Sequence, residues 1–323
     1  TTMAICQGLK YIVKDMQETR PNLLLGVPVI FENLYNKITR NVRKSGKEKQ
    51  LNTLFRINRV TKKIGLDLSG KLFRQITSVF GGRLRLMICG GAAINPQVLN
   101  GIGDFGILAL QGYGLTECSP MGALNPDTAP NPSSIGVCFP GFELKTVDLN
   151  EEGIGEICIR GDNVMMGYYQ MPEETAAVID EDQWFHTGDL GYIDENGYAY
   201  ITGRKKNVII TKNGKNVYPE ELEYQLSLSP YIEESFVFSS TQPGESDISI
   251  VASIRPDMEF IREELPTEPT DQDIKTILWE EVDKINKTAP LYRRIRKLIL
   301  RKKEFIKNTS NKLVRFAEEN KVE

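Results

Sequence analysis

The chain has 323 residues, which is enough for two domains. Its 40 Lys and Arg against 43 Asp and Glu leave a formal charge of −3, so the chain has no overall positive potential that would attract nucleic acid. Five cysteines without a CxxC pair argue against a disulfide framework, and the single histidine, His186, excludes a clustered-histidine metal site. No apolar window is long enough for a membrane span. We therefore expect a two-domain cytoplasmic protein whose metal ligands, if any, are oxygens.

The first 80 residues are predicted to be mainly helical. Apolar residues recur near helical spacing before residue 20, and Leu34 and Ile38 lie four apart. Between them, the short apolar run 23–30 contains Gly26, which favours a strand followed by a turn. The charged region 40–63 is predicted to be a solvated helical hairpin, with a membrane-facing patch as the alternative.

From residue 83 the pattern changes to strand, helix, strand. Apolar runs at 84–89 and 107–110 flank a Gly-Gly break and a helix-compatible stretch at 96–102, which predicts a βαβ unit. From 133 to 200, short β-type runs alternate with Gly, Pro, Asp and Asn. This portion is predicted to be a small, mostly antiparallel barrel or sheet.

After Gly203 the sequence predicts a small α+β domain. Asn213-Gly214 favours a tight hairpin, and Pro219 followed by two glutamates favours a helix start. Strands are predicted at 236–238, 248–254 and 297–300, and an amphipathic helix at 271–286. We place the domain boundary at about Gly203.

The first candidate motif is Gln-Gly-Tyr-Gly-Leu-Thr-Glu at 111–117, directly after a predicted strand. Its glycines allow a ligand to approach the backbone, and Tyr113 offers a face on which a base could stack. Thr116 can donate to a phosphate oxygen, and Glu117 supplies the hard oxygen that Mg²⁺ accepts. A glycine-rich turn with a solvated glutamate is the alternative interpretation.

The second motif places Asp189 between glycines after two bulky aromatic residues. A carboxylate on such a turn can accept both hydroxyls of a ribose, whereas an aspartate that caps its own turn is the common alternative. His186 is interpreted as a packing or hydrogen-bonded residue, because no nearby nucleophile needs it as a base.

Two further motifs are basic. Gly-Arg-Lys-Lys-Asn at 203–207 precedes Tyr-Pro-Glu-Glu-Leu-Glu at 218–223, and a polar loop at 308–315 carries Lys312 toward a predicted terminal helix. Considered singly, the basic residues at 203–207 are interpreted as an exposed face, and Lys312 is interpreted as an ordinary surface lysine.

In their order and spacing the four motifs, with the linking segments 155–161 and 167–169, resemble the core motifs of the adenylate-forming superfamily, which includes acyl-CoA synthetases, firefly luciferase and adenylation domains of peptide synthetases. The segment 26–35, Gly-Val-Pro-Val-Ile-Phe-Glu-Asn-Leu-Tyr, is similar to the corresponding stretch of long-chain fatty-acid ligases. The resemblance implies an α/β and α+β fold. Part of a large AMP-binding domain would occupy 1–203, with a βαβ portion to about 132 and a β-barrel portion from about 133. A small mobile domain would occupy 204–323.

The resemblance also implies roles for single residues. Those expected to line the adenine pocket are Gly90, Gly91, Ala92, Ala93, Gln111, Gly112 and Tyr113. Thr116 would contact the adenylate phosphate, and Glu117 would hold Mg²⁺.

In the second half of the chain, the resemblance implies that Asp189 and Arg204 grip the ribose and that Lys206 is the hinge. Lys312 would bridge the acyl carboxylate and the α-phosphate. The family commonly has glycine before this lysine, whereas this chain has Asn311, a residue that still tolerates left-handed backbone.

The implied reaction joins a long-chain fatty acid, ATP and coenzyme A through an acyl-adenylate. The sequence contains no Ser/Thr/Gly-rich loop ending in Pro-Lys-Gly for the β and γ phosphates. We therefore expect a carboxy-terminal piece of a longer ligase, inactive by itself. A ligase for another carboxylate, or a non-catalytic adenine-nucleotide or partner-binding module, are the alternatives. Peripheral membrane association and oligomeric state are left open.

Overall fold

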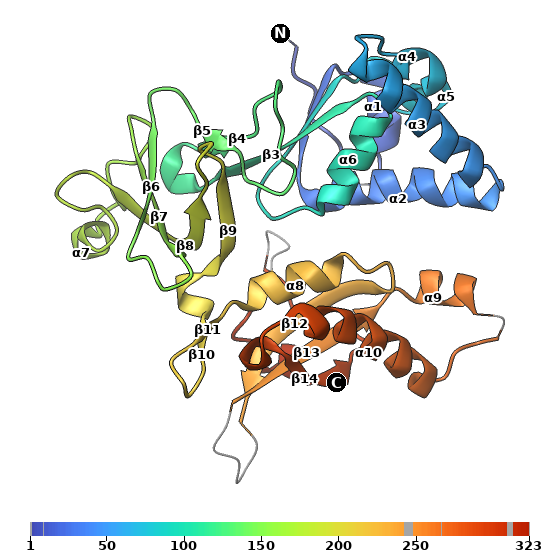
Figure 1. Ribbon diagram of the computed structural model, residues 1–323. Coiled ribbons are helices and arrows are strands. Elements are labelled where there is room, and N and C mark those ends of the chain that lie inside the picture. The colour runs from blue at the N-terminus through green and yellow to red at the C-terminus, as the bar shows by residue number, and fades with distance from the viewer. Residues whose placement is uncertain (1, 9, 242–247, 266, 309–312, 323) are drawn as a thin grey trace. The chain divides into compact units, whose positions relative to one another are not determined.

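The computed structural model describes residues 2–8, 10–241, 248–265, 267–308 and 313–322 (Figure 1). Contacts divide the chain into two compact units. Unit 1 contains Thr1–Thr187 and Gly191–Ile201, and unit 2 contains Gly188–Leu190 and Thr202–Glu323. That the chain has two domains with a boundary at Gly203 stays a prediction.

Unit 1 is built on a five-stranded sheet in the order β1-β2-β3-β4-β5. Its strands are β1 (Leu23–Gly26), β2 (Leu86–Cys89), β3 (Leu108–Gly114), β4 (Met121–Leu124) and β5 (Val137–Cys138). The first three strands are parallel and the last two are antiparallel to their neighbours. The predicted βαβ unit is confirmed, because a helix connects the parallel strands β2 and β3.

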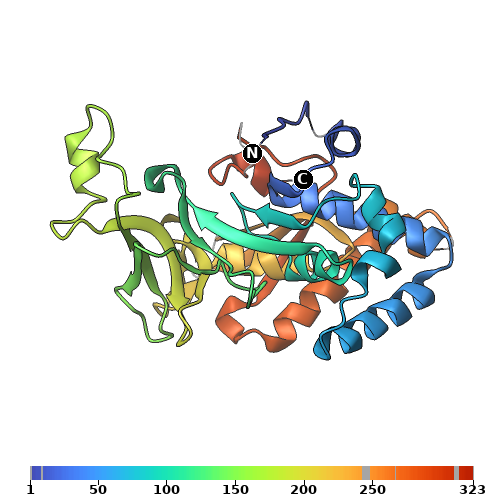
Figure 2. The ribbon, with the colours of Figure 1, turned by 90° about the horizontal axis from the view of Figure 1, so that it is seen from above.

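The helices of unit 1 are α1 (Ile12–Thr19), α2 (Pro28–Lys44), α3 (Glu48–Lys63), α4 (Ser69–Leu72), α5 (Arg74–Ser78), α6 (Pro96–Asp104) and α7 (Pro172–Ala176). The run 23–30, predicted to be a strand followed by a turn, forms strand β1 up to Gly26, and helix α2 begins at Pro28 where the rest of the turn was expected. Phe31 of α2 and Leu99 of α6 pack with Met87 of β2 in one core cluster. Helices α2, α3 and α6 are mutual neighbours (Figure 2).

A second sheet contains β6 (Glu143–Val147), β7 (Gly155–Arg160), β8 (Phe185–Ile193) and β9 (Ala199–Arg204), in that order. The expected barrel is wrong in one respect: among the described residues this sheet is open. Strand β5, which precedes β6, pairs with β4 of the first sheet. Gly136, the residue before β5, forms an isolated bridge with Ala199 at the start of β9.

Unit 2 continues the chain with a hairpin, a three-stranded sheet and covering helices. Its elements are β10 (Ile209–Ile210), β11 (Asn216–Val217), α8 (Pro219–Ser227), β12 (Ile232–Ser240), β13 (Ser249–Pro256), α9 (Met258–Glu264), α10 (Asp271–Thr288) and β14 (Ile295–Leu300). Strand β13 is antiparallel to β12 and parallel to β14. The predicted Asn-Gly hairpin is confirmed by the β10–β11 pairing, with Gly214 at φ +71°.

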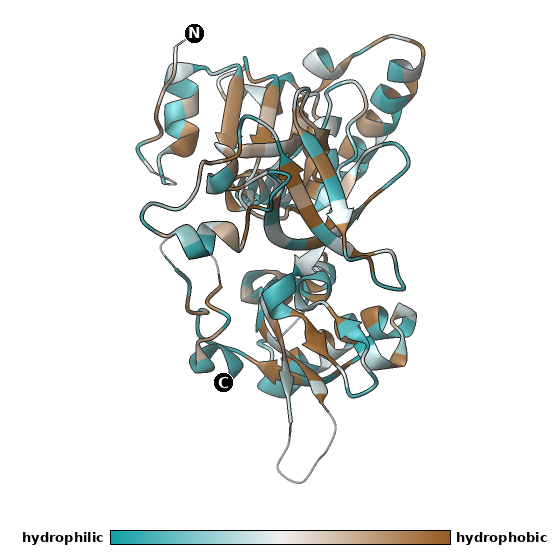
Figure 3. Ribbon diagram, turned by 90° about the vertical axis from the view of Figure 1, so that its left-hand side faces the viewer, coloured by the Kyte–Doolittle hydropathy of each residue, from teal (hydrophilic) through white to brown (hydrophobic). Residues whose placement is uncertain are grey.

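Apolar residues concentrate in the strands, whereas the helices carry both hydrophobic and hydrophilic residues (Figure 3). Helix α10 contributes Ile274, Leu278 and Val282 to the unit 2 core. The predicted terminal helix after Lys312 is wrong: the described residues there contain only a 3-10 turn, η4 (Glu318–Lys321). Within the described chain, every helix is too short or too polar to cross a membrane.

Candidate functional site

The end of β3 and the turn after it form the centre of the candidate site. Gln111 and Tyr113 are buried in the sheet. Gly114 closes the strand where a Cβ atom would lie 1.8 Å from the backbone oxygen of Pro120, so no larger residue fits without moving the chain. The next three residues form the 3-10 turn η1 (Thr116–Cys118), with Thr116 exposed to solvent.

Glu117 is held by a loop that follows β7. The Tyr168 hydroxyl donates to Glu117 Oε1 at 3.0 Å, and the Met165 backbone N–H donates to the Glu117 carbonyl oxygen at 2.8 Å. Burial, together with the bond to the Glu117 carboxylate, raises the pKa of Tyr168. Glu117 thus presents a half-buried carboxylate in a fixed place, which suits a hard cation.

The glycine-containing loop after β2 lies at the same edge of the sheet. Because Cys89 pairs with Gln111, the residues that follow β2 and β3 emerge together at the carboxyl ends of parallel strands. A Cβ on Gly90 would lie 3.7 Å from the Gly112 carbonyl oxygen, so the two backbones are neighbours. The rest of this loop is exposed, namely Gly91, Ala92 and Ala93. The glycine loop and the end of β3 are therefore neighbours at one edge of the sheet, whereas the Tyr113 side chain is packed in a core cluster with Cys118 and Ala123.

Glu32 on α2 is a residue of this region that the sequence did not single out. It accepts a hydrogen bond from the backbone N–H of Asn95, which lowers its pKa, but burial is the larger effect and raises it. Asn95 in turn caps α6, since its side chain accepts from the Gln97 N–H at 2.8 Å. Through Asn95, Glu32 therefore holds the end of the loop 90–95 that leads into α6. In the sequence it is one polar residue of an amphipathic helix, with no signal of this contact.

Asp189 and Arg204 form a close pair within unit 2. Arg204 Nε lies 2.6 Å from Asp189 Oδ1, and Asp189 is only 3 % exposed. A buried carboxylate held by a guanidinium is fixed in position. Thr202 reinforces the turn by donating from Oγ1 to the Leu190 carbonyl oxygen at 3.1 Å. Lys206, the expected hinge, is exposed in the 3-10 turn η2 (Lys205–Asn207) that follows β9.

His186 lies between two carboxylates. Its Nδ1 is 3.3 Å from Glu156 Oε2, and its Nε2 is 3.6 Å from Asp180 Oδ2. The Cys158 sulfur is also 3.5 Å from Nδ1, a geometry that could suggest a nucleophile and its base. Burial and the Glu156 carboxylate raise the pKa of Cys158 to about 12, which keeps the thiol protonated. This environment suits a hydrogen-bonded structural histidine.

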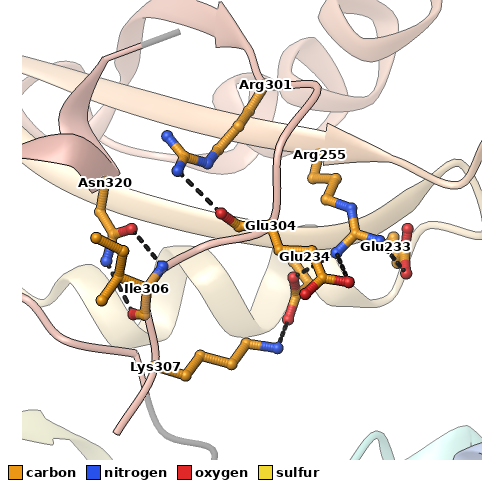
Figure 4. A network of polar contacts seen from close by, with 8 residues as sticks. All are labelled: Glu233, Glu234, Arg255, Arg301, Glu304, Ile306, Lys307 and Asn320. Atoms are coloured by element: carbon orange, nitrogen blue, oxygen red, sulfur yellow. Dashed lines mark hydrogen bonds and ion pairs between the residues drawn. The ribbon is translucent and has the colours of Figure 1, made fainter.

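Lys312 lies outside the described residues, which resume on both sides of 309–312. An isolated bridge pairs Lys307 with Leu313. Asn320, fully buried, accepts from the Ile306 N–H at 2.7 Å and donates to the Ile306 carbonyl oxygen at 3.1 Å (Figure 4). It also donates to the Val314 carbonyl oxygen at 2.9 Å. Ile306 and Val314, on either side of 309–312, are therefore held by the carboxy-terminal turn.

Arg315 attaches the same segment to α8 and β12. Its guanidinium donates to the Glu223 carboxylate, lies 3.2 Å from Glu220 Oε1 and donates to the Val237 carbonyl oxygen at 3.4 Å. Glu223 also accepts from the Val237 N–H at 2.7 Å. Burial raises the pKa of Glu223 to about 7, while Arg315 acts in the opposite direction. The glutamate motif at 218–223 and the segment that contains Arg315 are thus joined by a buried contact between Glu223 and Arg315.

Comparison with known proteins places both halves of the chain. Residues 3–169 match the family model described as AMP-binding enzyme, and residues 206–321 match the model described as AMP-binding enzyme C-terminal domain. The chain is 30 % identical to long-chain-fatty-acid–CoA ligase FadD15 of Mycobacterium bovis over 259 residues, which cover 75 % of this chain and 42 % of that protein. It is 29 % identical to human long-chain-fatty-acid–CoA ligase 1 over 266 residues, which cover 78 % of this chain and 37 % of the relative. The chain therefore spans about two fifths of the length of these relatives.

Solved structures show the same fold. An ATP-bound chimera of RpMatB and BxBclM matches with a TM-score of 0.67 and 26 % identity, covering 95 % of this chain and 52 % of that one. The anthranilate CoA ligase AuaEII in complex with anthranoyl-AMP matches with a TM-score of 0.70 and 18 % identity, covering 99 % and 53 %. The mixed α/β architecture predicted from the sequence is confirmed by these matches.

Proposed function

Because the chain belongs to the AMP-binding enzyme family, we propose that it supplies the adenylate-binding part of an ATP-dependent ligase that converts a long-chain fatty acid to its acyl-CoA through an acyl-adenylate. The observation that carries this proposal is the convergence of the glycine loop 90–93 and the segment 111–117 at one edge of the parallel strands. Crevices at the carboxyl ends of such strands are where α/β proteins bind nucleotides.

In this proposal each side chain has a limited task. The backbones of 90–93 and of 111–113 line the adenine pocket, while the Asp189–Arg204 pair holds the ribose hydroxyls. Thr116, exposed at the start of η1, donates to the α-phosphate. Lys312 places a cation between the acyl carboxylate and that phosphate as the carboxylate attacks phosphorus and pyrophosphate leaves.

Glu117 fits the Mg²⁺ that this chemistry requires, because its carboxylate is half-buried and oriented by Tyr168. When bound, the ion would neutralise charge on the phosphate oxygens. Exposed Lys206 follows Arg204 in a short turn between β9 and β10, a position where a few backbone rotations could reorient the residues that follow.

Hydrogen–deuterium exchange with AMP and with a non-hydrolysable palmitoyl-adenylate analogue tests the location of this site. We expect slower exchange in 90–95, 111–118 and 187–204, and unchanged exchange in α10, which the proposal leaves away from the nucleotide. Protection confined to other segments would contradict the assignment.

A ligase for a different carboxylate is the second candidate, since AuaEII, whose structure matches this fold, is described as an anthranilate CoA ligase. The two candidates predict different affinities in a series of acyl-sulfamoyl adenosines with acetyl, octanoyl, palmitoyl and anthraniloyl groups. For the fatty-acid ligase, affinity should rise with chain length, because each buried methylene contributes up to about 0.8 kcal/mol. Preference for the anthraniloyl compound would favour the alternative.

We also propose that the 323-residue chain does not turn over by itself. Its sequence lacks the Ser/Thr/Gly-rich segment ending in Pro-Lys-Gly that would hold the β and γ phosphates. An assay of AMP release with palmitate, ATP, Mg²⁺ and coenzyme A should therefore show no rate above background, and turnover at an ordinary rate of about 1 s⁻¹ or more would contradict this proposal.

A further inference from the structure

The hairpin formed by α2 and α3 with the intervening turn, residues 28–63, concentrates positive charge. This segment, called the basic hairpin below, contains ten Lys and Arg against two Glu, a net charge of +8. The remaining 287 residues carry a net charge of −11. Charge is therefore strongly separated in a chain whose total of −3 is close to neutral.

The outer side of the basic hairpin and its end also expose aliphatic side chains. On α3, Ile57 is 44 % and Val60 63 % exposed, and Ile64, the C-cap residue that follows the helix, is 71 % exposed. Their spacing of three and four residues places the three side chains in one row. Leu66, just beyond the helix, is 56 % exposed. Exposed Arg56 adjoins this row, so cationic and apolar groups lie on the same surface.

The other side of α3 is fixed to unit 1. Phe55 packs edge-on against Phe105, with ring centroids 5.3 Å apart. Asn58, 2 % exposed, donates to Ser69 Oγ at 2.8 Å and accepts from the Leu68 N–H at 3.2 Å. These contacts determine which face of α3 is turned outward, and they leave the aliphatic row on the surface of unit 1.

We propose that the basic hairpin docks on the surface of a lipid bilayer that contains anionic lipids. Lys and Arg near such a surface are attracted by its negative potential, and an interfacial helix inserts its aliphatic side chains between the headgroups. Both requirements are met on α3 and at its C-cap by Arg56 and the row of Ile57, Val60 and Ile64.

A membrane fits this surface better than a nucleic acid does. Proteins that bind single strands combine cations with aromatic rings on which bases stack. Within the described part of the basic hairpin, the aromatic residues Phe31, Tyr35 and Phe55 are buried or half-buried. The large apolar side chains exposed there, Ile57 and Val60, are aliphatic. The proposal requires neither adenylate nor acyl binding, so its failure would leave the proposed function intact.

Co-sedimentation of the chain with vesicles tests the proposal. The probes are phosphatidylcholine vesicles with and without about 30 mol % phosphatidylserine, in about 0.1 M NaCl. We expect at least about tenfold stronger partitioning onto the anionic vesicles, and most of that gain should disappear in about 0.5 M NaCl. Equal partitioning onto both vesicles, or tighter binding to poly(U) RNA than to anionic vesicles, would overturn the proposal.

Charge reversal localises the binding surface. A triple variant, Lys47→Glu, Lys49→Glu and Arg56→Glu, should lower partitioning onto anionic vesicles at least about tenfold. The matched control reverses the same charge at exposed lysines of unit 2: Lys212→Glu, Lys287→Glu and Lys303→Glu. The control should lower partitioning less than about threefold. Equal losses in both would show that net charge and not the hairpin decides binding, and would overturn the proposal.

The aliphatic row is tested by Val60→Gln, which should lower partitioning about threefold without altering the thermal unfolding midpoint. A Val60→Gln variant that partitions as well as the wild type would show that the row does not insert. Because the comparison of neutral with anionic vesicles uses the unaltered chain, the proposal can be refuted even if a variant fails to fold.

Discussion

The pH dependence of unit 2 stability should be dominated by Glu223. Burial raises the pKa of this carboxyl to about 7 from an ordinary value of 4.5. The folded chain therefore holds a proton at Glu223 between about pH 4.5 and 7 that the unfolded chain has lost. The resulting stabilisation is complete below about pH 4.5 and is lost as the pH rises through 7. The difference between the two pKa values corresponds to about 3 kcal/mol of unfolding free energy, at about 1.4 kcal/mol for each pH unit.

Urea titrations at several pH values can measure this effect locally. Trp279, on α10, reports on unit 2 when the other tryptophan is replaced by Trp184→Phe. Relative to Glu223→Gln, which cannot ionise, the wild-type chain should lose about 2 to 3 kcal/mol of unfolding free energy between pH 5 and pH 8. Glu280→Gln, an exposed position on α10, is the control and should leave the pH profile of the unfolding free energy unchanged. A wild-type chain that gains stability with rising pH would refute the reasoning, because it would show that Arg315 keeps Glu223 ionised with a lowered pKa.

Three further substitutions test the candidate site. Gly114→Ala should abolish AMP binding and lower the unfolding midpoint of unit 1, because its Cβ would meet the Pro120 oxygen. The control is Gly70→Ala, whose Cβ would point into open space. It should change AMP affinity and the unfolding midpoint by less than the error of measurement. Asp189→Asn should weaken AMP about 10- to 100-fold in a calorimetric titration, the cost of losing one charge-assisted bond; unchanged affinity would remove Asp189 from the ribose site. In a form of the protein that turns over, Lys312→Ala should slow acyl-adenylate formation about a hundredfold and spare thioester formation from supplied acyl-adenylate, and equal losses in both steps would count against its assigned role.

Local sequence signals predicted local structure well. The Gly-Gly break before 96–102 marked the turn between β2 and α6, and Asn213-Gly214 marked the β10–β11 hairpin. Helix α8 begins at Pro219, as predicted from the position of this proline before two glutamates. In each case the information lies within a few residues, because backbone preferences of Gly, Pro and Asn act over one turn.

Contacts between distant segments could not be predicted in the same way. Glu223 lies within a recognised motif, but its partner Arg315 is 92 residues away. In the sequence, Arg315 has the pattern of an ordinary surface cation, so nothing indicates this contact. The contact from Glu32 to Asn95 likewise depends on how α2 packs beside α6. The sequence predicted a barrel or a sheet for 133–200 and could not decide between them, because the pairing of β5 with β4 depends on tertiary packing and not on strand propensity.

The central claim is that this chain carries an adenylate site, and competitive calorimetry tests it most directly. AMP, ATP and palmitoyl-sulfamoyl adenosine would each be titrated into the chain in the presence of Mg²⁺. An adenylate site without a β- and γ-phosphate loop should bind the palmitoyl compound at least about tenfold more tightly than AMP, and ATP no more tightly than AMP. ATP binding that is clearly tighter than that of the palmitoyl compound would contradict the account and would favour a nucleotide-binding module without ligase chemistry.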